Sequence, residues 1–419
     1  MVGQMRFETM AKKLEINVLV SRIVIALALI AFLTIAIWLN LAVRSEQQFS
    51  LLAQSFLHGR LDFLEPPDGG WDDTTPYGGR YYWPLGPAPA VLLMPFELVG
   101  SWLGKTFYQG YLQIGLVLAV LVVIFRTARR IGYDRTDATY AAFAFCFASS
   151  FLGVALWPWS WYFAQVITCV ALFLAVLEMT GQRRPLIIGT LFAVCLGTRA
   201  TAALGLFWFI GEVALTPGAS KSERMRSIAI ATLPCAIVLG VLLLYNYARF
   251  GNALEQGYAA QIIPDIASNA RSIGIFSLRH VPTNLYALVL KSPVPILSGN
   301  ETTELKSPFF AANPWGMSVF VTSPWLARLF GFRYNDRTSR VILGTVIIVA
   351  VPILSYYAVG FRQFGYRYSL DFLPLLFYLL LRNYHAQRER LSAPFKIVII
   401  VSAIWDLNLF AGHYLWHLT

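Results

Sequence analysis

Residues 23–41 read IVIALALIAFLTIAIWLNL, and residues 342–359 read ILGTVIIVAVPILSYYAV, two long runs without a charged side chain. A helix of about 20 apolar residues crosses the hydrocarbon core of a bilayer. Membrane β-strands are shorter and alternate apolar with polar residues, because one face lines the lumen. These unbroken runs exclude the barrel pattern, and they predict an all-α membrane protein.

The composition of the whole chain agrees with this class. Over 419 residues, 57% are hydrophobic and 13% are charged, and the mean hydropathy is +0.59. A soluble domain carries about 25% charged residues. The net charge of +11 does not indicate nucleic acid, because Lys and Arg collect in the cytosolic loops of membrane proteins.

We predict about eleven spans, several of them shorter than a straight crossing needs. They cover residues 23–43, 108–126, 139–157, 161–179, 185–198, 201–216, 227–247, 316–330, 341–359, 370–382 and 397–412.

The positive charges orient this layout. With a cytosolic N-terminus, the short cytosolic segments hold 20 of the 33 Lys and Arg residues, as the positive-inside rule expects. Two long loops, residues 44–107 and 248–315, then share the opposite face. The proline-rich stretch 87–103 is placed along that outer interface, because counting it as a span would put Arg126, Arg129 and Arg130 outside. We expect one integral membrane domain, residues 1–419.

The first long loop gathers acidic residues among glycines and prolines, which form turns that can hold carboxylates in fixed positions. A carboxylate there can act as a general base on an acceptor hydroxyl or position a metal ion. The alternative for each residue is a solvated loop charge. The acidic residues are Glu46, Asp62, Glu65, Asp68, Asp72 and Asp73.

This loop resembles the lipid-linked-sugar glycosyltransferases of the GT-C superfamily. The resemblance is to bacterial relatives of the protein mannosyltransferase and aminoarabinose transferase branch (glycosyltransferase family 39-like). It rests on LAQSFLHGRL at residues 52–61, on Asp73 four residues before Tyr77, and on GRYYWPLGPAPA at residues 79–90. The resemblance implies a GT-C fold with juxtamembrane helices and an essential acid in a long first periplasmic loop.

Two further segments are similar to this group, NYARFGNALEQGY at residues 246–258 and QFGYRYSLDFLP at residues 363–374. Members of the mannosyltransferase branch usually place an Asp-Glu pair just after the first span, where this chain has Ser45-Glu46. The catalytic acid is therefore Asp73 or Glu46, and the surrounding spacing favours Asp73.

Donor-phosphate binding is predicted for Arg249, Arg367, Arg199 and Lys291, which map to the outer face. A guanidinium group meets phosphate oxygens in pairs, so Arg suits a leaving phosphate. Each has a structural alternative. Arg199 can cap a helix break, Lys291 can be an ordinary loop charge, and Arg367 can pair with Asp371 one helical turn on.

Aromatic residues crowd the same interface, where they can stack on sugar rings or form a membrane belt. For the aromatic residues between positions 157 and 162, we prefer the interpretation as a membrane-interface belt. The candidates for binding the acceptor or sugar are Asp72, Tyr81, Tyr82, Glu255 and Tyr258.

These observations predict a glycosyltransferase that moves a sugar from a polyprenyl-phosphate donor to a hydroxyl on a lipid, glycan or protein. It would act at the periplasmic or extracellular side of a bacterial inner membrane. No metal site is predicted, although the carboxylates permit a divalent cation. The alternatives are a secondary transporter or lipid flippase, and a non-catalytic scaffold. Transporters typically carry charges at mid-membrane, whereas the unusual residues here lie in loops.

Overall fold

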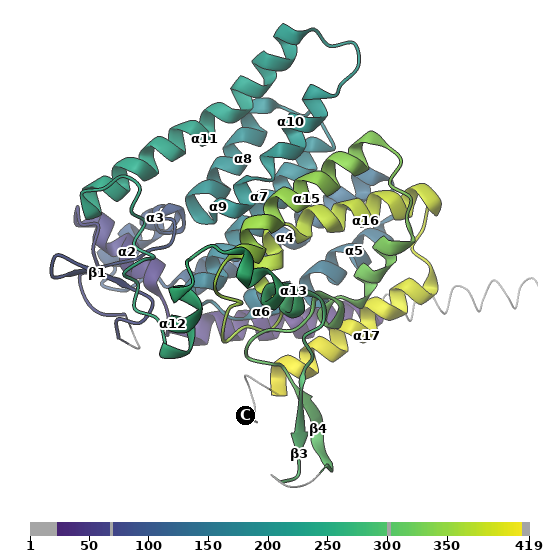
Figure 1. Cartoon of the computed structure of the whole chain (residues 1–419). Coiled ribbons are helices and arrows are strands. Elements are labelled where there is room, and N and C mark those ends of the chain that lie inside the picture. Colours follow the sequence, from purple (N-terminus) through teal and green to yellow (C-terminus); the bar gives the residue numbers. More distant parts are fainter. Residues whose placement is uncertain (1–22, 68–69, 300–302, 413–419) are drawn as a thin grey trace, which may run out of the picture.

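A computed structural model describes residues 23–67, 70–299 and 303–412 of the chain. The predicted cytosolic segment 1–22 and Asp68 lie outside the described residues. The described part is mostly helical, with two short antiparallel strand pairs (Figure 1).

The longer helices form one bundle. They are Ile23–Ala42, α4 (Gln109–Ile131), α5 (Arg135–Phe147), α7 (Ser160–Met179), α8 (Pro185–Thr198), α11 (Lys221–Phe250), α15 (Arg337–Ser355), α16 (Leu373–Gln387) and α17 (Ala393–Phe410).

Shorter elements connect these helices. They are α2 (Gln48–Leu57), β1 (Thr75–Tyr77), β2 (Arg80–Tyr82), α3 (Ala88–Trp102), α6 (Phe151–Leu156), α9 (Ala200–Ala203), α10 (Leu206–Ala214), α12 (Asp265–Ser272), α13 (Val281–Val289), β3 (Val294–Leu297), β4 (Leu305–Ala311) and α14 (Val319–Thr322). Three 3-10 helices complete them: η1 (Leu278–His280), η2 (Pro324–Gly331) and η3 (Arg367–Asp371).

Six of the described helices are long and apolar enough to cross a membrane: Ile23–Ala42, α4, α7, α11, α15 and α17. The predicted count of about eleven spans is not confirmed. Residues 139–157 divide into α5 and α6, and residues 201–216 lie in α9 and α10. Residues 316–330 contain only α14 and most of η2. Apolar composition runs through these segments without a break, so it did not reveal where the helices end.

Local capping explains several helix starts. Asp134, Ser220, Asp336 and Ser392 each accept a hydrogen bond from a backbone N–H in the first turn of α5, α11, α15 and α17 respectively. Such caps satisfy amide groups that have no partner within the helix. At the other end of α11, Gly251 adopts the left-handed conformation that closes a helix (φ 67°).

α7 lies at the centre of the bundle and α11 at its side. Of the most apolar part of α7, 83% is buried, against 6% for α11. α7 packs against α4, α8 and α16, and α11 runs along α8 (Figure 1). The exposed apolar side chains of α11 are those expected of a helix that faces lipid.

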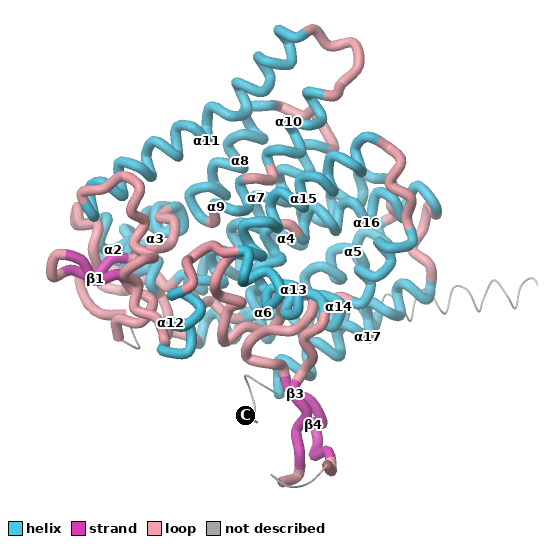
Figure 2. The backbone as a smooth tube through the Cα atoms, in the orientation of Figure 1, coloured by secondary structure: helices cyan, strands magenta, loops and turns pink. Residues whose placement is uncertain are grey.

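The two long loops meet at one end of the bundle. Figure 2 shows irregular chain and both strand pairs around α2, α12 and α13. The stretch 87–103 forms α3, a continuous helix with Pro95 inside it, which packs against α2 and the end of α8. Its position on the membrane surface stays a prediction.

Candidate functional site

Asp73 lies where the two long loops pair with each other. Its backbone N–H donates to the carbonyl of Ile262 over 2.9 Å, and the N–H of Ile262 donates to the carbonyl of Thr74 over 2.8 Å. Asp73 itself has a left-handed backbone (φ 61°). This conformation is uncommon for a residue with a side chain, and it persists where surrounding contacts impose it. The position of Asp73 is therefore set by the second loop as well as the first.

The pKa of the Asp73 carboxyl group lies well above its usual range. Its pKa is raised to about 6, first by burial and then by repulsion from Glu46 and Asp72, while Arg367 acts in the opposite direction. A carboxyl with this pKa is largely ionised near neutral pH and still accepts a proton readily. Such perturbed groups are typical of catalytic sites.

Glu46 is the second predicted acid, and its main chain is fixed by the bundle. Its carbonyl accepts hydrogen bonds from the N–H and hydroxyl of Ser160 and from the amide of Gln109, over 2.9 to 3.2 Å. Its carboxylate accepts from Gln48 Nε2 over 2.6 Å. Glu46 also has a left-handed backbone (φ 57°). Both candidate acids thus belong to one electrostatic site, and both occupy unusual backbone conformations.

Arg367 is a cation whose charge acts on Asp73 and lowers the pKa of its carboxyl group. It is 8% exposed, and its Nε has no hydrogen-bond partner within the part of the chain that the structure describes. Among the described residues, no carboxylate lies within ion-pair distance of Arg367. The rings of Tyr368 and Tyr162 lie 5.1 and 5.7 Å from its guanidinium carbon, and Gln165 Nε2 donates to its backbone carbonyl over 2.9 Å.

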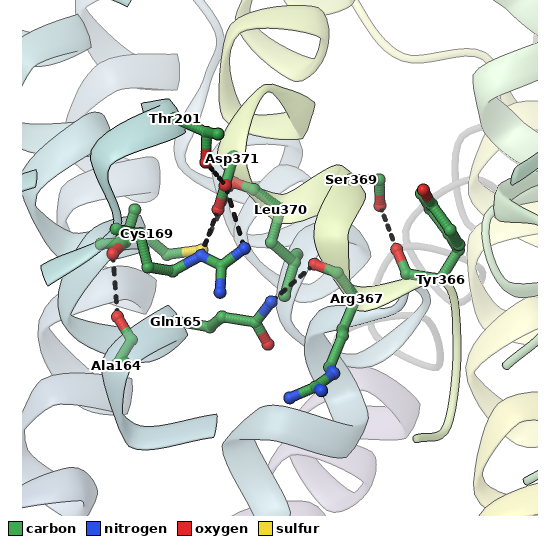
Figure 3. Close-up of polar contacts among 11 residues, drawn as sticks. Ala164, Gln165, Cys169, Thr201, Tyr366, Arg367, Ser369, Leu370 and Asp371 are labelled. Atoms are coloured by element: carbon green, nitrogen blue, oxygen red, sulfur yellow. Dashed lines mark hydrogen bonds and ion pairs between the residues drawn. The ribbon is translucent and has the colours of Figure 1, made fainter. Parts of the chain in front are cut away.

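Asp371 pairs with Arg199 and leaves Arg367 without this partner. Arg199 Nε and Nη2 donate to the two carboxylate oxygens of Asp371 over 2.6 and 3.0 Å, and the hydroxyl of Thr201 donates to one of them. Figure 3 shows the Arg367 guanidinium directed away from Asp371. The alternative of an Arg367–Asp371 pair is therefore wrong. The reason is that η3 is a 3-10 helix, so α-helical spacing does not bring the two side chains together.

The two remaining cations differ. Arg249 is 4% exposed, and it donates to the carbonyl of Trp83 over 2.8 Å and to Asn246 Oδ1 over 2.7 Å. It thereby ties the end of α11 to the first loop. Lys291 lies over the ring of Trp315, and within the described ranges no hydrogen bond or ion pair connects its side chain to the two candidate acids.

The predicted sugar-binding residues also divide. Tyr258 lies within electrostatic reach of Arg199 and Tyr368, and burial raises its pKa to about 12, so its hydroxyl stays protonated. Glu255 is close enough to Arg249 to interact with it electrostatically.

The other three lie in the first loop. Tyr81 is stacked on Trp71 with ring centroids 3.8 Å apart, and Tyr82 is buried against Phe250. Asp72 is exposed beside Asp73. Roles for all five residues in binding sugar or acceptor stay predictions.

Sequence reasoning missed Gln261 and Tyr357. Gln261 Nε2 donates to both the backbone carbonyl and Oδ1 of Asp73, over 3.1 Å each. Tyr357 interacts electrostatically with Asp73. No sequence signal marks either residue, because each reaches Asp73 from a segment far along the chain. Across residues 23–67, 70–299 and 303–412, no three His, Cys, Asp or Glu side chains gather as a metal site.

No protein-family model matches the chain, and no curated protein matches it in sequence. Solved structures of an archaeal oligosaccharyltransferase from Archaeoglobus fulgidus are similar to it. The apo form is 14% identical with a TM-score of 0.46, and it matches 91% of this chain and 56% of its own. AglB in complex with an inhibitory peptide and a dolichol-phosphate is 13% identical with a TM-score of 0.49, and it matches 92% of this chain and 55% of its own. This chain therefore spans little more than half the length of those proteins. Similarity of this size assigns neither a family nor an activity.

Proposed function

We propose that this protein is a membrane glycosyltransferase that takes a sugar from a polyprenyl-phosphate donor and transfers it to a hydroxyl acceptor. The reaction would take place on the membrane face opposite the N-terminus. The observation that carries the proposal is the electrostatic interaction of Asp73, a half-buried carboxyl with a pKa of about 6, with Arg367, a buried cation that has no ion-pair partner among the described residues.

The proposed reaction is a single displacement. The Asp73 carboxylate accepts the proton of the acceptor hydroxyl while that oxygen forms a bond to the anomeric carbon of the sugar. The bond from this carbon to the phosphate oxygen breaks, and polyprenyl phosphate leaves with the electron pair. The proton stays on Asp73 until it passes to solvent. Attack opposite the leaving group inverts the anomeric configuration.

Arg367 suits the departing phosphate. Within the described ranges no carboxylate forms an ion pair with it, and a buried guanidinium stabilises developing negative charge more strongly than an exposed one. The positive charge of Arg199 is compensated by Asp371, so Arg199 is a weaker candidate for this role. The Asp73 carboxylate and the Arg367 guanidinium together supply the base and the positive charge for the departing phosphate that the transfer needs.

The test is transfer from a panel of labelled polyprenyl-phosphate sugars by the purified protein in lipid vesicles, with Asp73→Asn as the main variant. We expect transfer to fall by about 10²- to 10⁴-fold, the usual contribution of a general base. Glu65→Gln, which changes an exposed acid of the same loop, should keep its activity. Full activity of Asp73→Asn would refute the assignment of the base. Movement of the donor across the vesicle without turnover would instead favour a transporter.

A further inference from the structure

A short segment of the second long loop, residues 257–262, lies against the chain around Asp73, and we call it the strap. It is attached at both ends. The hydroxyl of Thr75 donates to the carbonyl of Gly257 over 2.9 Å, and Ile262 exchanges backbone hydrogen bonds with Asp73 and Thr74. The strap therefore follows the backbone on which the candidate base is carried.

Within the strap, Gln261 makes the most direct contact with the base. It is 6% exposed, and its Nε2 is 3.1 Å from both Oδ1 and the backbone carbonyl oxygen of Asp73. One amide group thus holds the carboxyl and the left-handed main chain of the same residue. A side chain whose backbone and head group are both fixed has little rotational freedom to lose when it reaches a reactive geometry.

The strap is itself held from the other side. Arg271, in the last turn of α12, donates from Nη1 to the carbonyls of Tyr258 and Gln261 over 3.1 and 2.7 Å. This clamp fixes the backbone of Gln261. A residue that merely filled space would not need a charged group directed at its own carbonyl.

Resting on the proposed function, we infer that Gln261 is a positioning residue that orients the Asp73 carboxyl group for proton transfer from the acceptor. In this role Gln261 contacts the base and neither the sugar nor the acceptor, and it acts through Asp73. The contact crosses from one long loop to the other, so the second loop takes part in setting the catalytic geometry.

The effect of Gln261 on protonation has a definite sign. An amide N–H that donates to a carboxylate favours the ionised form, so its removal raises the pKa of that carboxyl. The other groups that act electrostatically on Asp73 are Glu46 and Asp72 from the first loop, Arg367 from η3, and Tyr357, which follows the end of α15. None of them is altered by a substitution at Gln261. In the uncharged variant Gln261→Ala, a shift in the titration of Asp73 would therefore report the lost amide contact.

The kinetic experiment compares Gln261→Glu, Gln261→Ala and Gln261→Asn with the unchanged protein. Gln261→Glu keeps the shape of the side chain but replaces the donor by a carboxylate. We expect kcat to fall about tenfold with little change in KM, since a hydrogen bond to a charged group is stronger than one between neutral groups. The acid limb of kcat/KM should move up by about one pH unit. Gln261→Asn keeps an amide on a shorter side chain. Its kcat and the position of its acid limb should therefore lie between those of Gln261→Ala and those of the unchanged protein.

Gln256→Glu is the matched control, because it places the same charge at an exposed position of the same loop. It should leave the acid limb where it is. An equal shift in Gln256→Glu, or no shift in Gln261→Glu, would overturn the inference.

A second measurement does not depend on turnover. Infrared difference titration against Asp73→Asn follows the protonated carboxyl of Asp73 in the resting protein. The titration midpoint should rise in Gln261→Ala and Gln261→Glu, and an unchanged midpoint would overturn the role of Gln261. If no donor on the panel is turned over, the proposed function fails, and this titration still decides whether Gln261 controls the protonation of Asp73.

Discussion

The charges around Asp73 make the pH dependence of the reaction the sharpest test of the site. If the Asp73 carboxylate is the base, the rate follows its ionised fraction. With a pKa of about 6, this fraction is about nine-tenths near pH 7 and about one-tenth near pH 5. We therefore expect kcat/KM to fall about tenfold between these two pH values, with a single ionisation on the acid side.

Two substitutions should move this acid limb, the fall of kcat/KM at low pH, in opposite directions. Glu46 raises the pKa of Asp73 and Arg367 lowers it. Glu46→Gln removes a repulsive negative charge, so the acid limb should move to lower pH. Arg367→Gln removes an attractive positive charge, so the limb should move to higher pH. Asp72 is the weakest of the three influences, and Asp72→Asn should shift the limb downward by less than Glu46→Gln does.

The assay is kcat/KM for the labelled donor across the pH range at constant ionic strength, because salt screens such interactions. Each pH unit of displacement corresponds to about 1.4 kcal/mol of interaction between the changed charge and Asp73. The absolute rate of Arg367→Gln should also drop, since Arg367 is the proposed phosphate ligand. The position of the limb is read separately from the rate. Shifts of the same sign in Glu46→Gln and Arg367→Gln, or a limb that moves in neither, would refute Asp73 as the base.

Two further predictions concern stability. Asp371 is fully buried with Arg199 as its ion-pair partner, so Asp371→Asn should destabilise the fold by about 3–5 kcal/mol, measured by thermal unfolding. Replacing both Asp371 and Arg199 by Leu should recover most of this loss. A loss below about 1 kcal/mol in Asp371→Asn would contradict the pairing. Gly257 has a φ of +96°, and an added Cβ would lie 2.9 Å from the hydroxyl oxygen of Thr75. Gly257→Ala should therefore cost about 1–3 kcal/mol and loosen the strap, seen as faster hydrogen exchange in residues 257–262. Gly251→Ala, where φ is also positive but the space is open, should leave the exchange of the strap unchanged.

Much of this molecule was predictable from the sequence because it depends on local composition. Uninterrupted apolar runs and a low content of charge predict helices in lipid wherever they occur along the chain. Residue chemistry marked the acidic residues of the first loop and Arg367 as candidates, and the resemblance to GT-C glycosyltransferases narrowed the acids to Asp73 and Glu46. Helix ends were predicted less well, since the breaks within residues 139–157 and 201–216 fall inside apolar sequence.

The tertiary structure decided which candidates act on one another. Asp371 pairs with Arg199, 172 positions away in the chain, although Arg367 is its near neighbour in sequence. Gln261 reaches Asp73 across 188 positions. Electrostatic energies and hydrogen bonds depend on distances in space, whereas a sequence pattern reports only residues within a turn or two of one another. For that reason the sequence supplied the carboxylates and guanidinium groups, and the fold alone determined that Arg199 pairs with Asp371 and that Glu46 and Arg367 act on Asp73.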